Sequence, residues 1–320
     1  MSETKKDDLS VVVFANRKDF FISKLCIASI RFYYPDVEIL LVKDRLNGDF
    51  NTATLCKVFN VKVFELGKRY FGWSAGKIFF LLNDKIPKKR YLCLDSDIIF
   101  IGNLLDKLNL ETGDFVLHPE VYPQPFSDMV KSVFLDEEKI KEYYPEYTYP
   151  GFFFNAGQTV VTPGLLSKEF FLPSFNPDQY PYFRDQAIFP LVDQSILNIV
   201  IPINMKNGSI KVSTVPYMLW SVDFFKDPTN QSIEKFSNGD DHPFLVHYAG
   251  DVRTHIIKMM KGSEILLFFR KFYYSKLTNF EIRLDRIQDR LAAYKPLARI
   301  LYYKNRVLLE LRKKTKGAQG

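Results

Sequence analysis

Apolar and polar positions in the first hundred residues follow two spacings, one typical of buried strands and one typical of helices. Short, mainly apolar segments predict buried strands at 10–15, 38–42 and 61–66. One face of a helix over 20–33 is indicated by Phe21, Leu25, Ala28 and Phe32. We expect a second helix over 74–82 and, over 91–100, an apolar strand broken by two carboxylates. Strands that alternate with helices predict an α/β domain with a largely parallel sheet.

The later part of the chain is less regular. Segment 119–150 is rich in Pro, Tyr and Glu and predicts a loop-bearing insertion. We expect another strand over 152–161, a helix after Pro190, and strand-like pieces in KVSTVPYMLW and HPFLVHYAG. Beyond Gly262 the chain is helical and basic, with one apolar helix face at Leu284, Ile287, Leu291 and Tyr294.

These patterns define the expected domain organisation. A polar, disordered N-terminus covers 1–9, a single α/β domain covers 10–261, and a basic helical C-terminal extension covers 262–320. No linker rich in Pro, Gly and Ser precedes the extension, so we expect it to pack on the body.

The composition excludes several classes of protein. Of 320 residues, 47% are hydrophobic and 25% are charged, which excludes a largely disordered chain. There is no run of 18 apolar residues, as a transmembrane helix needs, and the start MSETKKDDLS lacks the apolar stretch of a secretory signal. Cys26, Cys56 and Cys93 are too widely spaced for a disulfide framework or a zinc site, which favours reduced cysteines in the cytoplasm.

The net charge of +7 is unevenly distributed. From Arg253 to Gly320 there are 17 Lys and Arg against 5 Asp and Glu, a net charge of +12, so the preceding residues carry −5. Such an asymmetry is typical of a surface that meets nucleic acid, phospholipid or a phosphorylated substrate. Nucleic acid is disfavoured because the basic residues alternate with an apolar stripe and the body is acidic.

The segment from Leu297 to Lys316 predicts a basic amphipathic helix. Its apolar positions are Ile300, Leu301, Val307, Leu308 and Leu311, and its basic positions are Arg299, Lys304, Arg306, Arg312, Lys313, Lys314 and Lys316. Such a helix can lie on an anionic membrane surface. The alternative is that its stripe packs on the acidic body or on a second subunit of a homo-oligomer.

Two carboxylates, Asp95 and Asp97, follow the apolar residues of YLCLDSDIIF. Side chains two positions apart in an extended chain point to the same side, and open α/β sheets bind ligands at the carboxyl ends of their strands. Oxygen ligands suit Mg²⁺ or Mn²⁺, and such an ion could hold a diphosphate. The alternative is an exposed Asp-Ser-Asp turn without a function.

His247 lies in the segment VHYAGDVR. Its imidazole suits Mn²⁺ as a third ligand beside two carboxylates, or it is a structural histidine at a strand end. Gly250 would allow the backbone to approach a phosphate closely, and Arg253 could pair with that phosphate.

Together these segments resemble glycosyltransferase family 8, the retaining GT-A enzymes that include glycogenin and bacterial lipopolysaccharide galactosyl- and glucosyltransferases. The matching elements are the first β-α-β unit from Val11, Asp95-Ser96-Asp97, Phe154-Asn155-Ala156-Gly157, DQSILN from Asp193, and His247 with Gly250. They occur in family order over residues 10–255.

The resemblance implies a GT-A, Rossmann-like fold and a UDP-sugar donor whose hexose, glucose or galactose, is transferred with retention. It implies Mn²⁺, or Mg²⁺, bound by Asp95, Asp97 and His247, with Ser96 between the carboxylates. Donor-binding positions would be Ala15, Arg17, Asp19, Lys77, Gly250 and Arg253. Asn155, Asp193 and Gln194 would lie near the donor sugar, with Gln194 by the anomeric carbon.

The sequence departs from the family in two loops. Arg253-Thr254-His255 stands where the family usually has Lys-Pro-Trp, and Arg17 and Asp19 stand where it often has Asp and Asn. Asp185-Gln186 competes with Asp193-Gln194, which we prefer because Leu197-Asn198 follows it.

A protein that binds nucleotide sugars without turnover is the alternative function. The acceptor can be a glycolipid, lipopolysaccharide, another glycan or a protein, at the inner face of the membrane.

Overall fold

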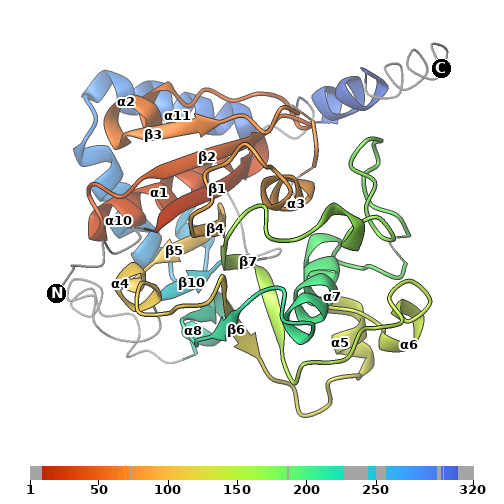
Figure 1. Ribbon diagram of the computed structural model, residues 1–320. Coiled ribbons are helices and arrows are strands. Elements are labelled where there is room, and N and C mark those ends of the chain that lie inside the picture. Colours follow the sequence, from red (N-terminus) through yellow and green to blue (C-terminus); the bar gives the residue numbers. More distant parts are fainter. Residues whose placement is uncertain are drawn as a thin grey trace.

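The computed structural model describes residues 9–68, 70–72, 74–185, 187–226, 244–249, 257–293, 297 and 299–308. They fold around a seven-stranded sheet in the order β3-β2-β1-β4-β7-β6-β8 (Figure 1). Its strands are β1 (Ser10–Asn16), β2 (Ile39–Asp44), β3 (Val61–Phe64), β4 (Tyr91–Asp95), β6 (Phe115–Glu120), β7 (Phe153–Val161) and β8 (Val212–Thr214). A second sheet, in the order β5-β10-β9, contains β5 (Ile98–Phe100), β9 (Met218–Trp220) and β10 (Leu245–His247).

Helices cover both faces of the large sheet (Figure 1). They are α1 (Phe20–Tyr33), α2 (Ala53–Phe59), α3 (Ala75–Leu81), α4 (Leu104–Leu108), α5 (Asp128–Val133), α6 (Glu137–Ile140), α7 (Asp193–Lys206), α8 (Ser221–Phe224), α10 (Ser263–Ser275) and α11 (Asn279–Ala293). Short 3₁₀ turns are η1 (Arg17–Asp19), η2 (Lys168–Phe170) and η5 (Ile257–Met259).

Strand β1 shows why its apolar run is uninterrupted. Val11 and Val13 belong to the hydrophobic cluster that contains α1 and α10, whereas Val12 and Phe14 belong to the cluster that contains α3 and α7. Successive side chains of a strand point to opposite faces, and a sheet covered on both faces has apolar residues at every position. The two hydrophobic clusters therefore hold the sheet between two layers of helices.

Most of the predicted elements are present. The strands at 10–15, 38–42, 61–66 and 152–161 are β1, β2, β3 and β7, and the helices at 20–33 and 74–82 are α1 and α3. The pairs β3–β2, β2–β1, β1–β4 and β6–β8 are parallel. Strand β7 is antiparallel to both of its neighbours, β4 and β6, so the sheet is mixed but largely parallel, as expected.

Two predictions of local structure need refinement. The apolar segment 91–100, which two carboxylates interrupt, forms two strands: the chain turns at Ser96–Asp97 and continues as β5 in the second sheet, antiparallel to β10. The loop-bearing insertion at 119–150 also contains α5 and α6, whose inward side chains Val130 and Ile140 are fully buried.

The C-terminal extension packs on the body, as expected. Phe32 of α1 contacts Phe268 and Phe272 of α10, with ring centroids 5.3 Å apart in both pairs. Residues 299–308 form a further helix.

At the other end of the chain, Leu9, which the sequence placed in a disordered N-terminus, is 2% exposed. Residues 1–8, Tyr294 and the predicted positions from 309 to 320 lie outside the described residues.

None of the helices in the described residues is long and apolar enough to span a membrane.

Helix α11 is held to α1 by a buried ammonium group. Lys24 is 2% exposed, and its Nζ lies 2.8 Å from Oδ1 of Asp285 and 2.6 Å from Oδ1 of Asp289. Removing one partner of a buried ion pair leaves charge without compensation in an apolar environment. This contact therefore contributes to the attachment of the C-terminal extension.

We predict that Lys24→Met lowers the free energy of unfolding by about 3 kcal/mol, because two carboxylates would remain without their counter-charge. The matched control is Lys62→Met, whose side chain is 64% exposed and pairs with Glu38 at 2.8 Å; it should cost less than about 1 kcal/mol. Urea denaturation followed by circular dichroism measures both. Equal losses in the two variants would contradict the prediction.

Candidate functional site

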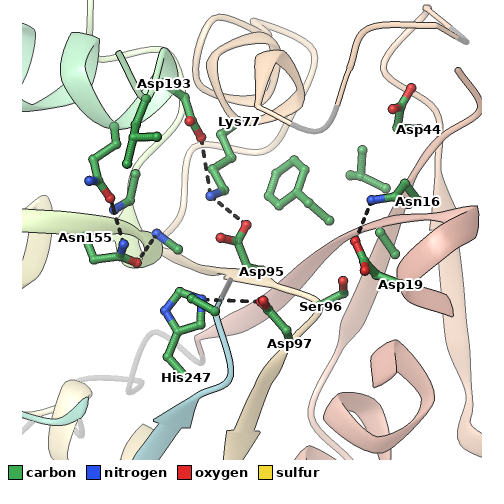
Figure 2. Close-up of a pocket in the computed structure, with 18 of the residues that line it drawn as sticks. Asn16, Asp19, Asp44, Lys77, Asp95, Ser96, Asp97, Asn155, Asp193 and His247 are labelled. Carbon is green, nitrogen blue, oxygen red and sulfur yellow. Dashed lines mark hydrogen bonds and ion pairs between the residues drawn. The ribbon is translucent and has the colours of Figure 1, made fainter. Parts of the chain in front are cut away.

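A cavity of about 600 Å³ opens at the carboxyl ends of β1, β2 and β4. Ten of the residues predicted for the site line it: Ala15, Asp19, Lys77, Asp95, Ser96, Asp97, Asn155, Asp193, Gln194 and His247. Figure 2 shows Asp95 near the middle, with Asn155 and Asp193 on one side and Asn16, Asp19 and Asp44 on the other. The sheet thus brings polar groups from distant parts of the sequence to one place, where open α/β sheets bind ligands.

Strand pairing places His247 beside the two aspartates. Asp95 ends β4, Asp97 lies in the turn before β5, and His247 ends β10 opposite Ile98 of β5. The Nε2 atom of His247 lies 3.4 Å from Oδ1 of Asp97 (Figure 2). The backbone N–H of Tyr248 donates to the carbonyl oxygen of Asp97 at 3.0 Å. The register of the β5–β10 pair therefore fixes the position of His247 and of the turn that carries Asp97.

The Asp95, Asp97 and His247 side chains fit a divalent cation. Each offers one ligand atom, and the three atoms lie within 4.8 Å of one another. Asp97 and His247 are 4% and 3% exposed, and Nδ1 of His247 has no hydrogen-bond partner among the described residues. Two carboxylates and one imidazole are ligands that suit Mn²⁺, and carboxylates also suit Mg²⁺.

The indole ring of Trp220 stacks on the imidazole ring of His247. The two residues are neighbours in the β9–β10 pairing, and their rings are stacked with centroids 4.8 Å apart and an interplanar angle of 18°. Trp220 also lines the cavity. The stack restricts the rotation of the imidazole and keeps its Nε2 directed at Asp97.

Lys77 connects the metal-ligand group to α7. Its Nζ lies 2.7 Å from Oδ1 of Asp95 and 3.4 Å from Oδ2 of Asp193 (Figure 2). Burial alone would lower the pKa of Lys77, but the attraction of the two carboxylates outweighs burial and holds that pKa above its ordinary value. Burial raises the pKa of Asp193 to about 6, although Lys77 acts in the opposite direction. Lys77 is therefore a fixed positive charge between two acidic groups.

Asn155 and Gln194 form a second fixed pair. The Nδ2 of Asn155 donates to Oε1 of Gln194 at 2.7 Å, and Nε2 of Gln194 donates to the carbonyl oxygen of Val133 at 3.0 Å. Asn198, one helical turn further along α7, accepts from the backbone N–H of Phe154 at 3.0 Å and donates to its carbonyl oxygen at 2.8 Å. Residues of the predicted DQSILN element thus attach α7 to β7 and orient the Gln194 amide.

Gly157 shows how closely these groups are packed. A Cβ atom at this position would lie 2.5 Å from Oδ1 of Asn155, 2.7 Å from Cε1 of His247 and 2.8 Å from Oδ2 of Asp95. No larger residue fits there without displacing one of the three side chains. The glycine in Phe154-Asn155-Ala156-Gly157 is therefore required by close approach.

The other end of the cavity is lined by the segments that follow β1 and β2. The Nδ2 of Asn16 donates to Oδ2 of Asp19 at 2.8 Å, and both residues line the cavity. Asp44 is 2% exposed, and its Oδ1 accepts from the backbone N–H of Leu46 at 3.1 Å. Burial raises the pKa of the Asp44 carboxyl. Residues of this group that sequence reasoning missed are Asn16, Lys18, Asp44 and Asn47, and Asp44 carries a usable signal as the acidic end of an apolar strand.

Some predicted residues are not brought to the cavity. Arg17 does not line it: its guanidinium donates to the carbonyl oxygens of Asp49 at 2.8 Å and Leu291 at 3.3 Å. Asp185, of the competing Asp-Gln pair, accepts a bond from Tyr143 at 3.4 Å at an exposed position. Gly250, Arg253 and Gln186 lie outside the described residues.

Comparison with solved structures shows what the fold is similar to. The bifunctional glycosyltransferase WbbM matches with a TM-score of 0.57 and 14% identity, over 89% of this chain and 52% of that chain. The galactosyltransferase LgtC, solved with donor and acceptor sugar analogs, matches with a TM-score of 0.47 and 15% identity, over 84% of this chain and 97% of that chain. GlyE from Streptococcus pneumoniae TIGR4 matches with a TM-score of 0.48 and 15% identity, over 90% of this chain and 64% of that chain.

The chain spans about half the length of WbbM. No family model and no curated protein matches the sequence. At 14% identity the similarity to WbbM, a glycosyltransferase, establishes the fold alone. The chain therefore has the GT-A glycosyltransferase fold that its sequence predicts.

Proposed function

We propose that this protein is a metal-dependent glycosyltransferase that moves a hexose, glucose or galactose, from a UDP-sugar to an acceptor with retention of configuration. The proposal rests on one observation: the side chains of Asp95, Asp97 and His247 lie close together in one cavity of a GT-A fold. A cation held there would neutralise the diphosphate as it leaves, which is the chemistry a divalent metal supplies in such transfers.

The donor would lie along the cavity, with its nucleoside toward Ala15 and Asp19 and its diphosphate beside Asp95 and Asp97. Asn16 and Asp44 line the nucleoside end and add polar groups there. Arg17 is directed away from this end, so we do not assign it a donor contact. For Arg253 we keep the predicted pairing with the diphosphate.

The sugar would lie between the metal ligands and the start of α7. There Asp193 would accept bonds from sugar hydroxyls, and Gln194 would face the anomeric carbon. Asn155 orients the Gln194 amide, and Lys77 keeps Asp95 and Asp193 in place. The departing phosphate would take the acceptor's proton on the same face, so no flanking pair of carboxylates is needed as in glycoside hydrolysis.

We place this reaction in the cytoplasm, at the inner face of a membrane. Cys26, Cys56 and Cys93 are free, and the first and last of them are buried, which is typical of a reducing compartment. A glycolipid, lipopolysaccharide or other surface glycan is the acceptor class that suits this location, and a protein side chain remains the other class.

The experiment that tests the function is a donor screen with purified protein. UDP release is measured across UDP-sugars, with and without Mn²⁺. Metal-dependent release from UDP-glucose or UDP-galactose supports the proposal. Tight UDP-sugar binding without release identifies the alternative, a nucleotide-sugar-binding protein without turnover, and no binding of any UDP-sugar contradicts both.

We predict that Asp97→Asn lowers the affinity for Mn²⁺ in the presence of UDP by more than about 100-fold, because one of the three ligands loses its charge. Electron paramagnetic resonance of free Mn²⁺ measures binding without any turnover. The matched control is Asp136→Asn, a carboxylate whose side chain is 18% exposed and which lies outside both the cavity and the metal-ligand group. Its affinity for Mn²⁺ should change less than threefold, and unchanged binding in Asp97→Asn would exclude the site.

We predict that Gln194→Ala lowers kcat by about 100-fold, because a group beside the reacting carbon acts mainly in the transition state. The Kd for UDP, measured by calorimetry, should stay within threefold of the original value, because the nucleotide lies at the other end of the cavity. NMR of the product of the unaltered enzyme should show the donor's α-configuration. An inverted product, or a loss of UDP affinity that matches the loss of kcat, would contradict the proposed arrangement.

A further inference from the structure

Helix α11 lies on the body with its apolar face turned outward. Phe280, Leu284, Ile287 and Leu291 recur at the spacing of one helix face and are 69%, 43%, 52% and 52% exposed. Amphipathic helices of globular proteins ordinarily direct such a stripe at the core. In Figure 1, α11 runs along the outer edge of the molecule near α2, to which Lys57 and Glu281 join it at 3.3 Å. We refer to these four residues as the outer stripe.

The polar side of α11 determines this orientation. Lys24 of α1 donates to both oxygens of Asp285 at 2.8 Å and to Asp289 at 2.6 Å. The hydroxyl of Tyr273 also donates to Asp285, at 3.1 Å. Turning the outer stripe toward the core would expose Asp285 and leave Lys24 buried without a partner, which is strongly unfavourable. The exposure of the outer stripe is therefore fixed by a buried ion pair.

Positive charge flanks the outer stripe. Arg283, Arg286 and Arg290 are all exposed and, at helical spacing, follow one edge of the stripe. An apolar stripe with arginines along one edge matches a surface that is apolar inside and anionic outside.

The helix over 299–308 shows the same arrangement. Ile300, Tyr303 and Val307 are 64%, 63% and 53% exposed. On its inner side, Asn305 donates to the carbonyl oxygens of Arg45 at 3.0 Å and Leu46 at 3.1 Å. A second C-terminal helix thus contacts the body through a polar group and leaves apolar side chains outside.

We propose that the outer stripe of α11 is a docking surface for a lipid bilayer with anionic head groups. The stripe would enter the interface among the acyl chains, and the three arginines would meet the lipid phosphates. A second copy of the chain fits this surface less well, because a two-fold interface with antiparallel copies of α11 would bring each row of arginines against its own copy. The docking requires neither donor nor acceptor, so its test and the test of glycosyl transfer have separate outcomes.

The experiment is co-sedimentation of the full chain with vesicles of phosphatidylcholine, alone or mixed with phosphatidylglycerol. The unaltered protein should bind the mixed vesicles and bind the neutral ones more weakly. Leu284→Ser combined with Ile287→Ser should lower the partition into mixed vesicles by at least about tenfold. The matched control, Leu110→Ser combined with Met129→Ser, alters side chains that are 74% and 56% exposed elsewhere and should bind as the unaltered protein does.

Two further variants complete the test. Arg283→Gln combined with Arg290→Gln should weaken binding to mixed vesicles and reduce its dependence on salt. Ile287→Trp places a fluorophore on the stripe and should show a blue shift with mixed vesicles, a result that decides the question if the serine variant does not fold.

Equal binding by the unaltered protein and the folded serine variant overturns the inference, as does an unshifted emission from Ile287→Trp. A lipid-free dimer that the serine variant dissociates would also overturn it, because a second copy would then cover the stripe.

Discussion

The concentration of negative charge around one buried ammonium group is the constraint on which the site depends. Asp95 and Asp193 both lie within 3.4 Å of Lys77, and Asp97 adds a third carboxylate beside His247. One ammonium cannot compensate three carboxylates in a partly apolar environment. A divalent cation at Asp95, Asp97 and His247 would restore the balance, and the diphosphate that we propose would then meet a positive centre. This crowding also explains the glycine at position 157, because a Cβ atom there would collide with the side chains of Asn155, His247 and Asp95.

The sequence predicts the part of the fold in which local pattern and tertiary environment agree. The unit from β1 to β2 was predictable because its strands are apolar on both faces of a covered sheet and its helix follows the helical spacing of apolar residues. The change of sheet at Ser96–Asp97 was not, because apolar residues continue on both sides of it, and β5 belongs to a sheet whose other strands come from distant parts of the chain. Local periodicity cannot show that a strand changes sheets.

The same limit applies to the site residues. Asp95 was found because it ends an apolar strand, and Asp44 ends β2 in the same way, so the rule that identified one could have identified both. The position of Arg17 depends on η1: Asn16 caps this 3₁₀ turn and lies three residues before Asp19, so the two face the cavity together. Arg17 then points toward α11, and no pattern in the sequence distinguishes it from its neighbours.

The orientation of α11 shows what amphipathic spacing does and does not determine. The spacing predicts a helix, but either face can contact the body, and the choice here depends on a lysine placed among the apolar residues of α1. Lys24 is therefore the signal in the sequence that selects the polar face. Through Arg17 and Leu291, and through Asn305 with Arg45, the C-terminal helices also contact the segments after β1 and β2 that line the nucleoside end of the cavity. Arg17 and Arg45 do not line the cavity, but each is next in the chain to a residue that does, Asn16 and Asp44. A shift of α11 or of helix 299–308 would therefore act first on these two segments.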